Sequence, residues 1–285
     1  MFHASHCPLC GGGLAPAFEA ETPRGRMPVS LCRTCGSAVK TPFYDPPELT
    51  EIYRTYALHE ARYALPPGEA EALTAKLRRL ERFAPPRGRL LEIGCGRGHL
   101  LAIALARGWD ARGVELGSTR EHRLPEVRDR VRLIEAEADY AGLETGSTDV
   151  LCSYQVFEHP LRPAEALREW TRALRPGGLM VLDTPNAASL GARLHKGRWV
   201  QHARPEHFAV ASRRALERLF RDNRLRVIHR HHGGPPAVCS GGGTSTPSAA
   251  PRRILRHRWL SRLARALVHG FGLGDNVELT GRKSE

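Results

Sequence analysis

The sequence predicts an α/β protein in which helices cover both faces of a largely parallel β-sheet, with a small cysteine-containing segment at the N-terminus. Strand-like and helix-like patterns alternate after residues 85–86, an order that is typical of parallel sheets. A glycine-rich turn joins the first strand of this series to the helix that follows it. Two Cys-x-x-Cys pairs precede the series, within the first 42 residues.

The chain length allows one full α/β domain and a small appendage, since domains commonly span about 100 to 200 residues. The 285 residues leave little room for a second domain of that size. We expect a cysteine-containing module over 1–42, a helical lead-in or lid over 43–84, the main domain over 85–232, a flexible insertion over 233–251, and an amphipathic helix with the final strand over 252–285.

Composition places the chain among ordinary globular proteins. Hydrophobic residues make up 41% and charged residues 26%, values that exclude global disorder. The formal net charge of +13 could attract acidic partners such as nucleic acid, anionic lipid headgroups or phosphorylated metabolites. The arginines are scattered along the chain rather than gathered in one run, so we do not expect nucleic acid to be the partner.

The sequence also bears on cellular location. No apolar run reaches the roughly 18 to 20 residues of a membrane span, and the first residues, MFHASHCPLC, lack the charged and apolar regions of a secretory signal. We therefore expect a cytoplasmic protein. Seven cysteines, an odd number, argue against a disulfide framework in such a chain.

The N-terminal cysteines have the spacing of a metal site. Two Cys-x-x-Cys pairs are separated by 21 residues and comprise Cys7, Cys10, Cys32 and Cys35. Four thiolates suit a closed tetrahedral zinc site, which is structural because it leaves no coordination position open. A redox pair is the alternative, but such a pair normally opens a helix in a βαβ unit, which is absent here.

The elements of the main domain follow from periodicity. Apolar residues at helical spacing predict two leading helices, at 48–63 and 68–83, and two later helices, at 100–107 and 211–222. Short runs typical of strands lie at 89–93, 111–115, 131–134, 149–154, 179–183, 224–230 and 276–282. We expect the last of these strands to return as an antiparallel edge.

The turn after the first of these strands has the residues of a nucleotide-type binding loop. Glu92, Gly94, Gly96 and Gly98 give the spacing Glu-x-Gly-x-Gly-x-Gly, in which glycines let the backbone approach a ligand closely. A dinucleotide fingerprint would need another glycine three positions after the second, which this sequence lacks. Glu115 ends the next strand, where a carboxylate can bind both hydroxyls of a ribose.

Four segments together resemble the successive motifs of class I S-adenosylmethionine-dependent methyltransferases. They are LEIGCGRG, GVELG, STDVLCSYQVFEH at 147–159, and RALRPGGLMVLDTPN at 172–186. HARPEHFAVASRRALERLF at 202–220 and GDNVELTGRK at 274–283 resemble the C-terminal part of the small-molecule branch found in sugar and polyketide gene clusters. The resemblance implies a Rossmann-like sheet of seven strands, the last antiparallel, with the cofactor across the ends of the first strands.

The resemblance also implies roles for particular residues. Gly94 to Gly98 would line the methionine part of the cofactor, Glu115 would bind the ribose, and Asp139 would contact the adenine amino group, with Glu137 as an alternative. The full set of expected cofactor-binding residues is Glu92, Gly94, Cys95, Gly96, Gly98, Glu115, Leu116, Asp139, Tyr154 and Gln155.

Two histidines are candidates for the catalytic base. Methyl transfer needs donor and acceptor aligned about 3 Å apart, and a hydroxyl or carbon nucleophile must also lose a proton. His159 follows the fourth strand and His207 lies in the segment PEHF, and imidazole suits proton transfer near neutral pH. For each of them a purely structural hydrogen bond is the alternative.

The acceptor is less defined than the donor. We expect a small molecule, with a nucleotide-linked or lipid-linked sugar or another secondary or cell-envelope metabolite as the leading hypothesis. A zinc-containing RNA methyltransferase and a non-catalytic, methyltransferase-like binding module are the alternatives. The arginine-rich helix expected at 252–269 could contact an anionic membrane, or could simply pack its apolar stripe on the sheet.

Overall fold

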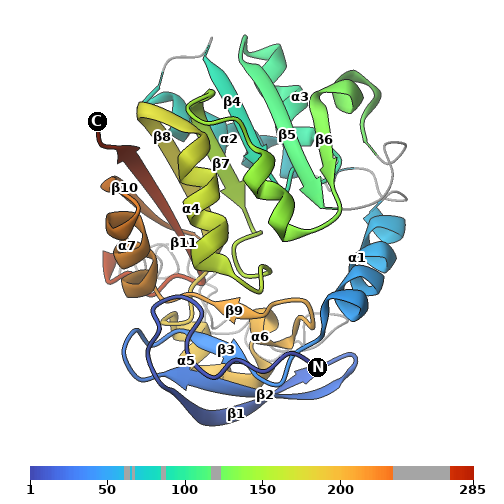
Figure 1. Ribbon diagram of the computed structural model, residues 1–285, viewed down its shortest axis with the longest axis vertical. Coiled ribbons are helices and arrows are strands. Elements are labelled where there is room, and N and C mark those ends of the chain that lie inside the picture. Colours follow the sequence, from blue (N-terminus) through green and yellow to red (C-terminus); the bar gives the residue numbers. More distant parts are fainter. Residues whose placement is uncertain (61–64, 66–67, 85–87, 117–122, 234–269) are drawn as a thin grey trace, which may run out of the picture.

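A seven-stranded sheet forms the centre of the protein (Figure 1). The computed structural model describes residues 1–60, 65, 68–84, 88–116, 123–233 and 270–285. The spatial order of the strands is β10-β11-β8-β7-β4-β5-β6, and β11 runs antiparallel to both of its neighbours. Their bounds are β4 Arg89–Ile93, β5 Asp110–Leu116, β6 Val131–Ile134, β7 Thr148–Tyr154, β8 Leu174–Pro185, β10 Leu225–Gly233 and β11 Asn276–Lys283. The predicted fold class, with seven strands and an antiparallel last strand, is confirmed.

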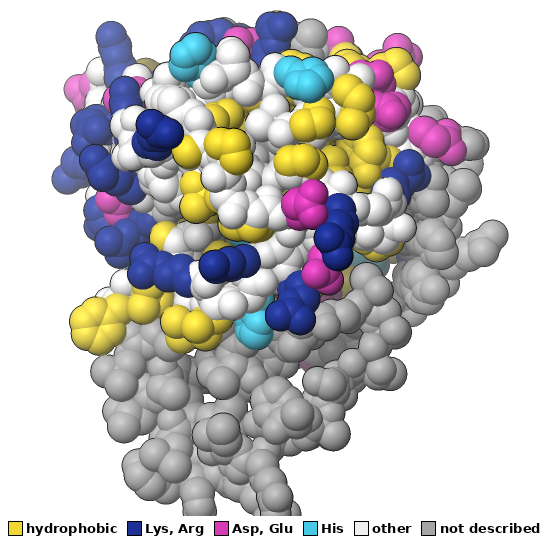
Figure 2. Space-filling view, turned by 90° about the horizontal axis from the view of Figure 1, so that it is seen from below, with side chains coloured by type: hydrophobic (Ala, Val, Ile, Leu, Met, Phe, Trp, Pro, Cys, Tyr) yellow, Lys and Arg dark blue, Asp and Glu magenta, His cyan; other side chains and the backbone are white. Residues whose placement is uncertain are grey.

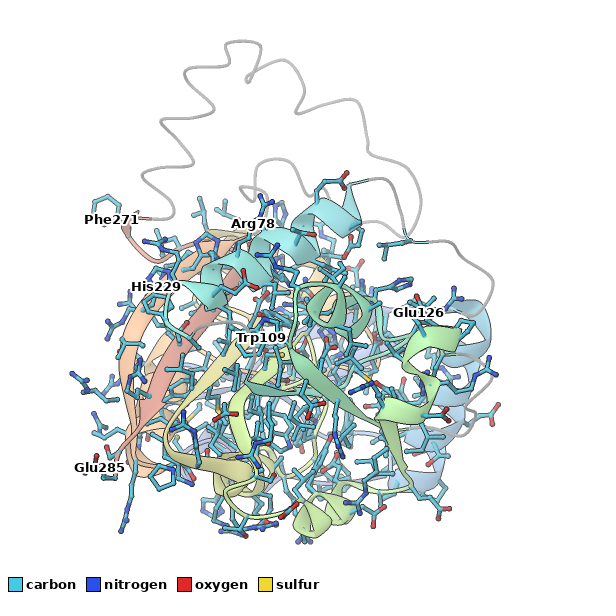
Figure 3. All side chains as sticks on the ribbon, turned by 90° about the horizontal axis from the view of Figure 1, so that it is seen from above. Arg78, Trp109, Glu126, His229, Phe271 and Glu285 are labelled. Carbon is cyan, nitrogen blue, oxygen red and sulfur yellow. The ribbon has the colours of Figure 1, made fainter. Side chains whose placement is uncertain are left out.

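Helices cover both faces of this sheet (Figures 1 and 3). On one face α2, Glu69–Glu81, and α3, His99–Ala106, pack over side chains such as Val150 and Cys152. On the other face α4, Pro163–Ala173, and α7, Arg213–Asp222, pack over Leu151 and its neighbours. Consecutive residues of β7 thus enter opposite core clusters, because side chains of a strand alternate between its two faces.

The leading helix α1, Pro46–Glu60, begins at a reciprocal cap. The backbone N–H of Glu48 donates to the Asp45 carboxylate at 3.1 Å, and the N–H of Asp45 donates to the Glu48 carboxylate at 2.9 Å. These bonds satisfy two backbone donors and set the start of the helix. Short helical segments complete the described chain: η2 Pro125–Arg130, η3 Glu137–Gly142, α5 Leu190–His195, η4 Lys196–Arg198 and α6 Val200–Ala203.

The N-terminal segment forms a second, four-stranded sheet. The strands β1 Leu14–Thr22, β2 Gly25–Cys32 and β3 Ala38–Lys40 pair in sequence order, and the fourth strand, β9 Ala209–Val210, comes from far along the chain. Periodicity did not reveal β1, because its register shifts between Pro16 and Phe18 and few of its side chains are buried. Apolar contacts also hold this segment, since Leu9 and Phe43 pack in the same cluster as Phe208.

Some expected elements lie outside the described residues. These are the insertion at 233–251 except Gly233, most of the arginine-rich helix at 252–269, and the end of the first leading helix beyond Glu60. Among the helices that the structure describes, none is long and apolar enough to span a membrane.

Ser212 joins the two sheets. Its Oγ accepts a hydrogen bond from the N–H of Ala215 at 3.1 Å, which caps α7, and donates to the carbonyl of Cys35 at 2.5 Å. Its own N–H donates to Ser37 Oγ at 3.0 Å. One buried side chain thus fixes the start of α7 and holds the loop after β2 against it.

We expect Ser212→Ala to lower the free energy of unfolding by about 1–2 kcal/mol, because it removes a helix cap and leaves a buried carbonyl without its donor. Equilibrium urea unfolding measures the change. Thr74→Ala is the matched control, since the Thr74 hydroxyl bonds only to Ala70 of its own helix. Equal losses in both variants would show that Ser212 does not join the sheets.

Candidate functional site

The glycine-rich turn between β4 and α3 has a backbone that only glycine adopts easily. Gly94, Gly96 and Gly98 have φ values of 68°, 51° and 88°, in the left-handed region. A Cβ on Gly94 would lie 2.2 Å from Val156 Cγ2, so no larger residue fits there. The N–H of Gly96 donates to Glu115 Oε2 at 2.7 Å, which places the carboxylate at the end of β5 directly beside the turn.

Cys95 points away from the surface of this turn. Its side chain is buried in the core cluster beneath α2 and α3, and a Cβ on Gly113 of β5 would lie 2.5 Å from its Sγ. Burial raises the pKa of its thiol. A ligand above the turn would therefore meet the backbone of Cys95 rather than its sulfur.

A layer of buried polar side chains lies where the strands meet α2. Asp183 of β8 and Glu278 of β11 are opposite one another in the register, and α2 supplies a cation to each. Lys76 Nζ lies 3.0 Å from Asp183, and Arg79 donates two hydrogen bonds to Glu278, at 3.1 and 2.7 Å. The ammonium group of Lys76 also lies 4.4 Å from the centre of the Tyr154 ring.

Gln155 is fixed against the same layer. Its N–H donates to the backbone carbonyl of Asp183 at 2.8 Å, and its side-chain amide donates to the Asp183 carboxylate at 3.3 Å. Its φ of 58° is unusual for a residue with a Cβ, and such conformations persist where surrounding contacts hold them. Tyr154 and Gln155 thus lie at the carboxyl end of β7, with Tyr154 paired to Asp183 in the register.

Glu92 is a buried carboxylate next to this layer. It is 6% exposed, and its Oε2 has no hydrogen-bond partner among the described residues. Burial, followed by the negative charge of Glu115, raises its pKa to about 8, while Lys76 acts in the opposite direction. A cation placed between Glu92 and Glu115 would relieve the repulsion between the two carboxylates.

The carboxylates of both acidic candidates after β6 accept hydrogen bonds from backbone N–H groups. Asp139 Oδ2 accepts from the N–H groups of Glu135 and Ala136, both at 2.9 Å, and these bonds lower the pKa of its carboxyl. Glu137 accepts from the N–H of Leu161, at 2.9 and 3.1 Å for its two oxygens. Each carboxylate therefore orders a loop at the carboxyl edge of the sheet, and an adenine contact remains a proposal.

The two histidines named from the sequence lie together around a residue that sequence reasoning missed, Glu158. Glu158 Oε1 is 3.7 Å from His207 Nε2 and 4.0 Å from His159 Nε2, and the two imidazole rings meet edge to face with centroids 5.0 Å apart. Thr184 donates to Glu158 Oε2 at 2.8 Å. The only sequence signal for Glu158 was its place beside His159 after a strand.

Backbone hydrogen bonds and burial hold this cluster. The N–H groups of Phe208 and Ala209 donate to the Glu158 carbonyl at 2.9 and 3.1 Å, which brings the His207 segment against the end of β7. Glu158 is fully buried, and burial raises its pKa to about 8. Burial also lowers the pKa of His159 to about 4 and that of His207 well below its ordinary value.

The four N-terminal cysteines also converge. Their sulfur atoms all lie within 4.8 Å of one another, with Cys7 and Cys35 3.7 Å apart and Cys10 and Cys32 3.4 Å apart. Thiolates around zinc, with bonds of about 2.3 Å, form a tetrahedron whose sulfur atoms are about 3.8 Å apart. The observed separations are close to that value, so these residues fit a zinc ion.

Comparison with known proteins decides the family. A family described as "Methyltransferase domain" matches residues 31–230, about 70% of the chain. This chain belongs to the methyltransferase domain family. The matched region includes the glycine-rich turn, Glu158 and both histidines, but only the second cysteine pair.

Relatives of this methyltransferase differ in their acceptors. It is 27% identical over 258 residues to a malonyl-[acyl-carrier protein] O-methyltransferase of Methylococcus capsulatus, covering 83% of this chain and 92% of the relative. It is 30% identical over 142 residues to a ubiquinone biosynthesis O-methyltransferase of the same organism, covering 46% of this chain and 60% of that relative. These names support S-adenosylmethionine-dependent methyl transfer and leave the acceptor open.

A solved structure shares the fold of this methyltransferase. The 1,6-didemethyltoxoflavin-N1-methyltransferase of Burkholderia thailandensis, solved with 1,6-didemethyltoxoflavin and S-adenosylhomocysteine, superposes with a TM-score of 0.55 at 16% sequence identity. The match covers 87% of this chain and 96% of that chain. At this level of sequence identity the match shows a shared fold.

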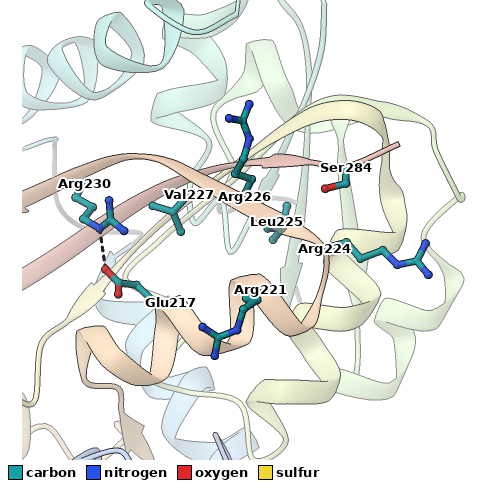
Figure 4. Close-up of a pocket in the computed structure, with 8 residues that line it drawn as sticks. All are labelled: Glu217, Arg221, Arg224, Leu225, Arg226, Val227, Arg230 and Ser284. Carbon is teal, nitrogen blue, oxygen red and sulfur yellow. Dashed lines mark hydrogen bonds and ion pairs between the residues drawn. The ribbon is translucent and has the colours of Figure 1, made fainter.

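Among the described residues on the face shown in Figure 2, Lys and Arg side chains occur in more than one group. A separate basic hollow of about 420 Å³ lies between α7 and β10 (Figure 4). It is lined by Glu217, Arg221, Arg224, Leu225, Arg226, Val227, Arg230 and Ser284. Since β10 is an edge strand, this hollow is apart from the glycine-rich turn on central β4.

Glu92 should make the stability of the ligand-free methyltransferase depend on pH. Its pKa is raised from 4.5 to about 8, so the folded chain holds a proton that the unfolded chain releases. Stability should therefore fall as pH rises between these values, and Glu92→Gln should reduce that fall. Urea unfolding at about pH 5.5, 7 and 8.5 measures it.

Glu144→Gln, at an exposed loop carboxylate, is the control for this experiment and should leave the slope unchanged. Parallel pH profiles for the wild type and Glu92→Gln would contradict the assignment of a buried, proton-binding carboxyl to Glu92.

Proposed function

We propose that this enzyme transfers a methyl group from S-adenosylmethionine to a small-molecule acceptor, with a sugar or another secondary or cell-envelope metabolite as the leading candidate. The observation that carries the proposal is the juxtaposition of two groups of residues. Glu92, Glu115 and the glycine-rich turn lie at the carboxyl ends of β4 and β5, and Glu158 with its two histidines follows the carboxyl end of the adjacent β7. Ligands of parallel α/β sheets bind at this edge.

The donor side is assigned by the chemistry of the residues. S-adenosylmethionine supplies an electrophilic methyl group on a sulfonium. Gly94, Gly96 and Gly98 allow close approach of its methionine part, with the backbone of Cys95, and Glu115 binds the ribose hydroxyls with Leu116 beside it. The buried carboxylate of Glu92 balances the positive charge of the bound cofactor.

The remaining donor contacts are proposed at the rim of the same edge. Tyr154 and Gln155 position the cofactor from the end of β7, where Asp183 already holds them. Asp139 supplies the adenine contact through the loop that its carboxylate orders, with Glu137 as the alternative on the same segment.

The acceptor side is formed by His159 and His207. An acceptor hydroxyl beside these rings must lose its proton as the methyl group is transferred. Two imidazoles can assist that loss in two ways, by accepting the proton or by holding a cation that acidifies the hydroxyl. Tyr53 of α1, whose ring centre lies 5.9 Å from that of His159, closes one side of the cluster.

The N-terminal module, proposed over 1–42, is a structural zinc unit. All four ligands come from Cys7, Cys10, Cys32 and Cys35, so the ion has no open position for chemistry. A hydrogen bond from Cys7 lowers the pKa of Cys35 to about 4, whereas the same contact raises the pKa of Cys7. A divalent cation relieves this competition because it stabilises every sulfur as a thiolate.

We expect S-adenosylmethionine to bind and Glu115→Ala to weaken binding by at least ~1.5 kcal/mol, since the lost hydrogen bonds involve a charged acceptor. Isothermal titration calorimetry gives both affinities. Glu126→Ala, at an exposed residue of η2, serves as the control. Unchanged affinity in Glu115→Ala would refute the ribose assignment.

Methyl transfer itself is tested with methyl-labelled S-adenosylmethionine and a fractionated small-molecule extract. We expect label to enter a small-molecule fraction, and His159→Ala and His207→Ala to reduce the rate while cofactor affinity is retained. Label that enters RNA instead would favour the zinc-containing RNA methyltransferase. Binding without any transfer, across extracts and purified sugars, would favour the non-catalytic module.

We expect one zinc ion per chain in the N-terminal module. Metal analysis of protein purified without chelators should return one equivalent, and Cys32→Ser should lose it with partial unfolding of the β1–β2 hairpin. Cys152→Ala is the control, because Cys152 lies in the sheet core and outside the module. Far less than one equivalent in the wild type would contradict this assignment.

A further inference from the structure

The Glu158 cluster has a feature that methyl transfer alone does not require. Glu158, His159 and His207 are side chains of kinds that commonly bind metals, and each offers one ligand atom within 4.8 Å of those of the other two. Glu158 Oε1 faces Nε2 of both histidines. The two nitrogen-to-oxygen separations are 3.7 and 4.0 Å, too long for hydrogen bonds. The groups therefore face one another without bonding directly.

The buried carboxylate is only half satisfied. Thr184 donates to Glu158 Oε2 at 2.8 Å, while Glu158 Oε1 has no hydrogen-bond partner among the described residues although the side chain is fully buried. An unpartnered polar atom at such a position is costly. Its free oxygen is the atom aimed between the two imidazoles.

The separations are near those of a coordination sphere. Metal bonds to imidazole and carboxylate of about 2.0–2.2 Å place tetrahedral ligand atoms about 3.4 Å apart. The observed 3.7 and 4.0 Å would each have to shorten, by about 0.3 and 0.6 Å, which small side-chain rotations supply. We propose that Glu158, His159 and His207 bind one divalent first-row transition-metal ion.

Neighbouring groups support this arrangement. The rings of His159 and His207 meet edge to face with centroids 5.0 Å apart, and the Tyr53 ring lies 5.9 Å from that of His159, so packing limits the rotation of both imidazoles. The nearby Arg204 is engaged by Glu206 at 3.5 Å. Two nitrogens and one oxygen favour zinc, cobalt, nickel, iron or manganese over calcium and magnesium.

The site is chemically distinct from the cysteine site. Three protein ligands leave coordination positions for water or for an acceptor oxygen, whereas four cysteines leave none. A bound hydroxyl would become more acidic, which is the second of the two ways in which these histidines can assist methyl transfer. Metal binding does not itself require that the proposed methyl transfer be correct.

Calorimetric titration of the zinc-loaded full chain with cobalt chloride tests the site. We expect one Co²⁺ to bind, and the affinity to fall at least about tenfold in His207→Gln and in Glu158→Gln. His202→Gln is the matched control, because His202 is a buried histidine that bonds to the Lys196 carbonyl outside the cluster. No Co²⁺ binding, or binding that neither cluster substitution weakens, overturns the proposal.

A spectroscopic readout on the wild type keeps the test decisive if a variant fails to fold. X-ray absorption of the Co²⁺-loaded, zinc-containing chain should show imidazole scattering and no sulfur in the first shell. A shell of sulfur alone would mean that cobalt had replaced zinc at the cysteines, and would overturn the proposal. These measurements need no acceptor, so their outcome is independent of the methyl-transfer assay.

Discussion

Parallel pairing of β4 with β5 on one side and with β7 on the other is the constraint on which the site depends. Parallel neighbours end at the same edge, so three separate crossovers deliver the glycine-rich turn, Glu115 and Tyr154 to one line. The loops after β4, β5 and β7 therefore lie side by side without any further contact between them being needed. Change in any one of these loops alters a ligand contact without altering the sheet.

Helix α2 combines two tasks on one surface. Leu77 and Leu80 are buried in the core cluster, while Lys76 and Arg79 face the carboxylates of the strands. Lys76 comes directly before Leu77 and Arg79 directly before Leu80, so the two cations lie on a stripe of the helix next to that of the leucines. Burying acids under a helix is tolerable here because the helix carries the opposite charges. By contrast, Glu92 and Glu158 each have one oxygen with no hydrogen-bond partner among the described residues.

Much of the sheet could be predicted because its signals are local. A strand such as β4 is a short apolar run next to glycines, and the motif order then supplied the family and the number of strands. β9 has two residues, and its pairing with β3 depends on a contact across the fold, so no local pattern indicates it. Glu158 likewise depends on tertiary structure, because an acidic residue beside His159 in sequence gives no sign that it will be fully buried.

The pairing of Val39 with Ala209 has a consequence for synthesis of the chain. A ribosome releases the β1–β2 hairpin long before it makes the residues that complete that sheet. The edge of β3 that pairs with β9 therefore has no partner while β4 to β8 of the central sheet are being made. The N-terminal sheet can be completed only when 209–210 have been made, and these residues follow directly on the segment that brings His207 to Glu158.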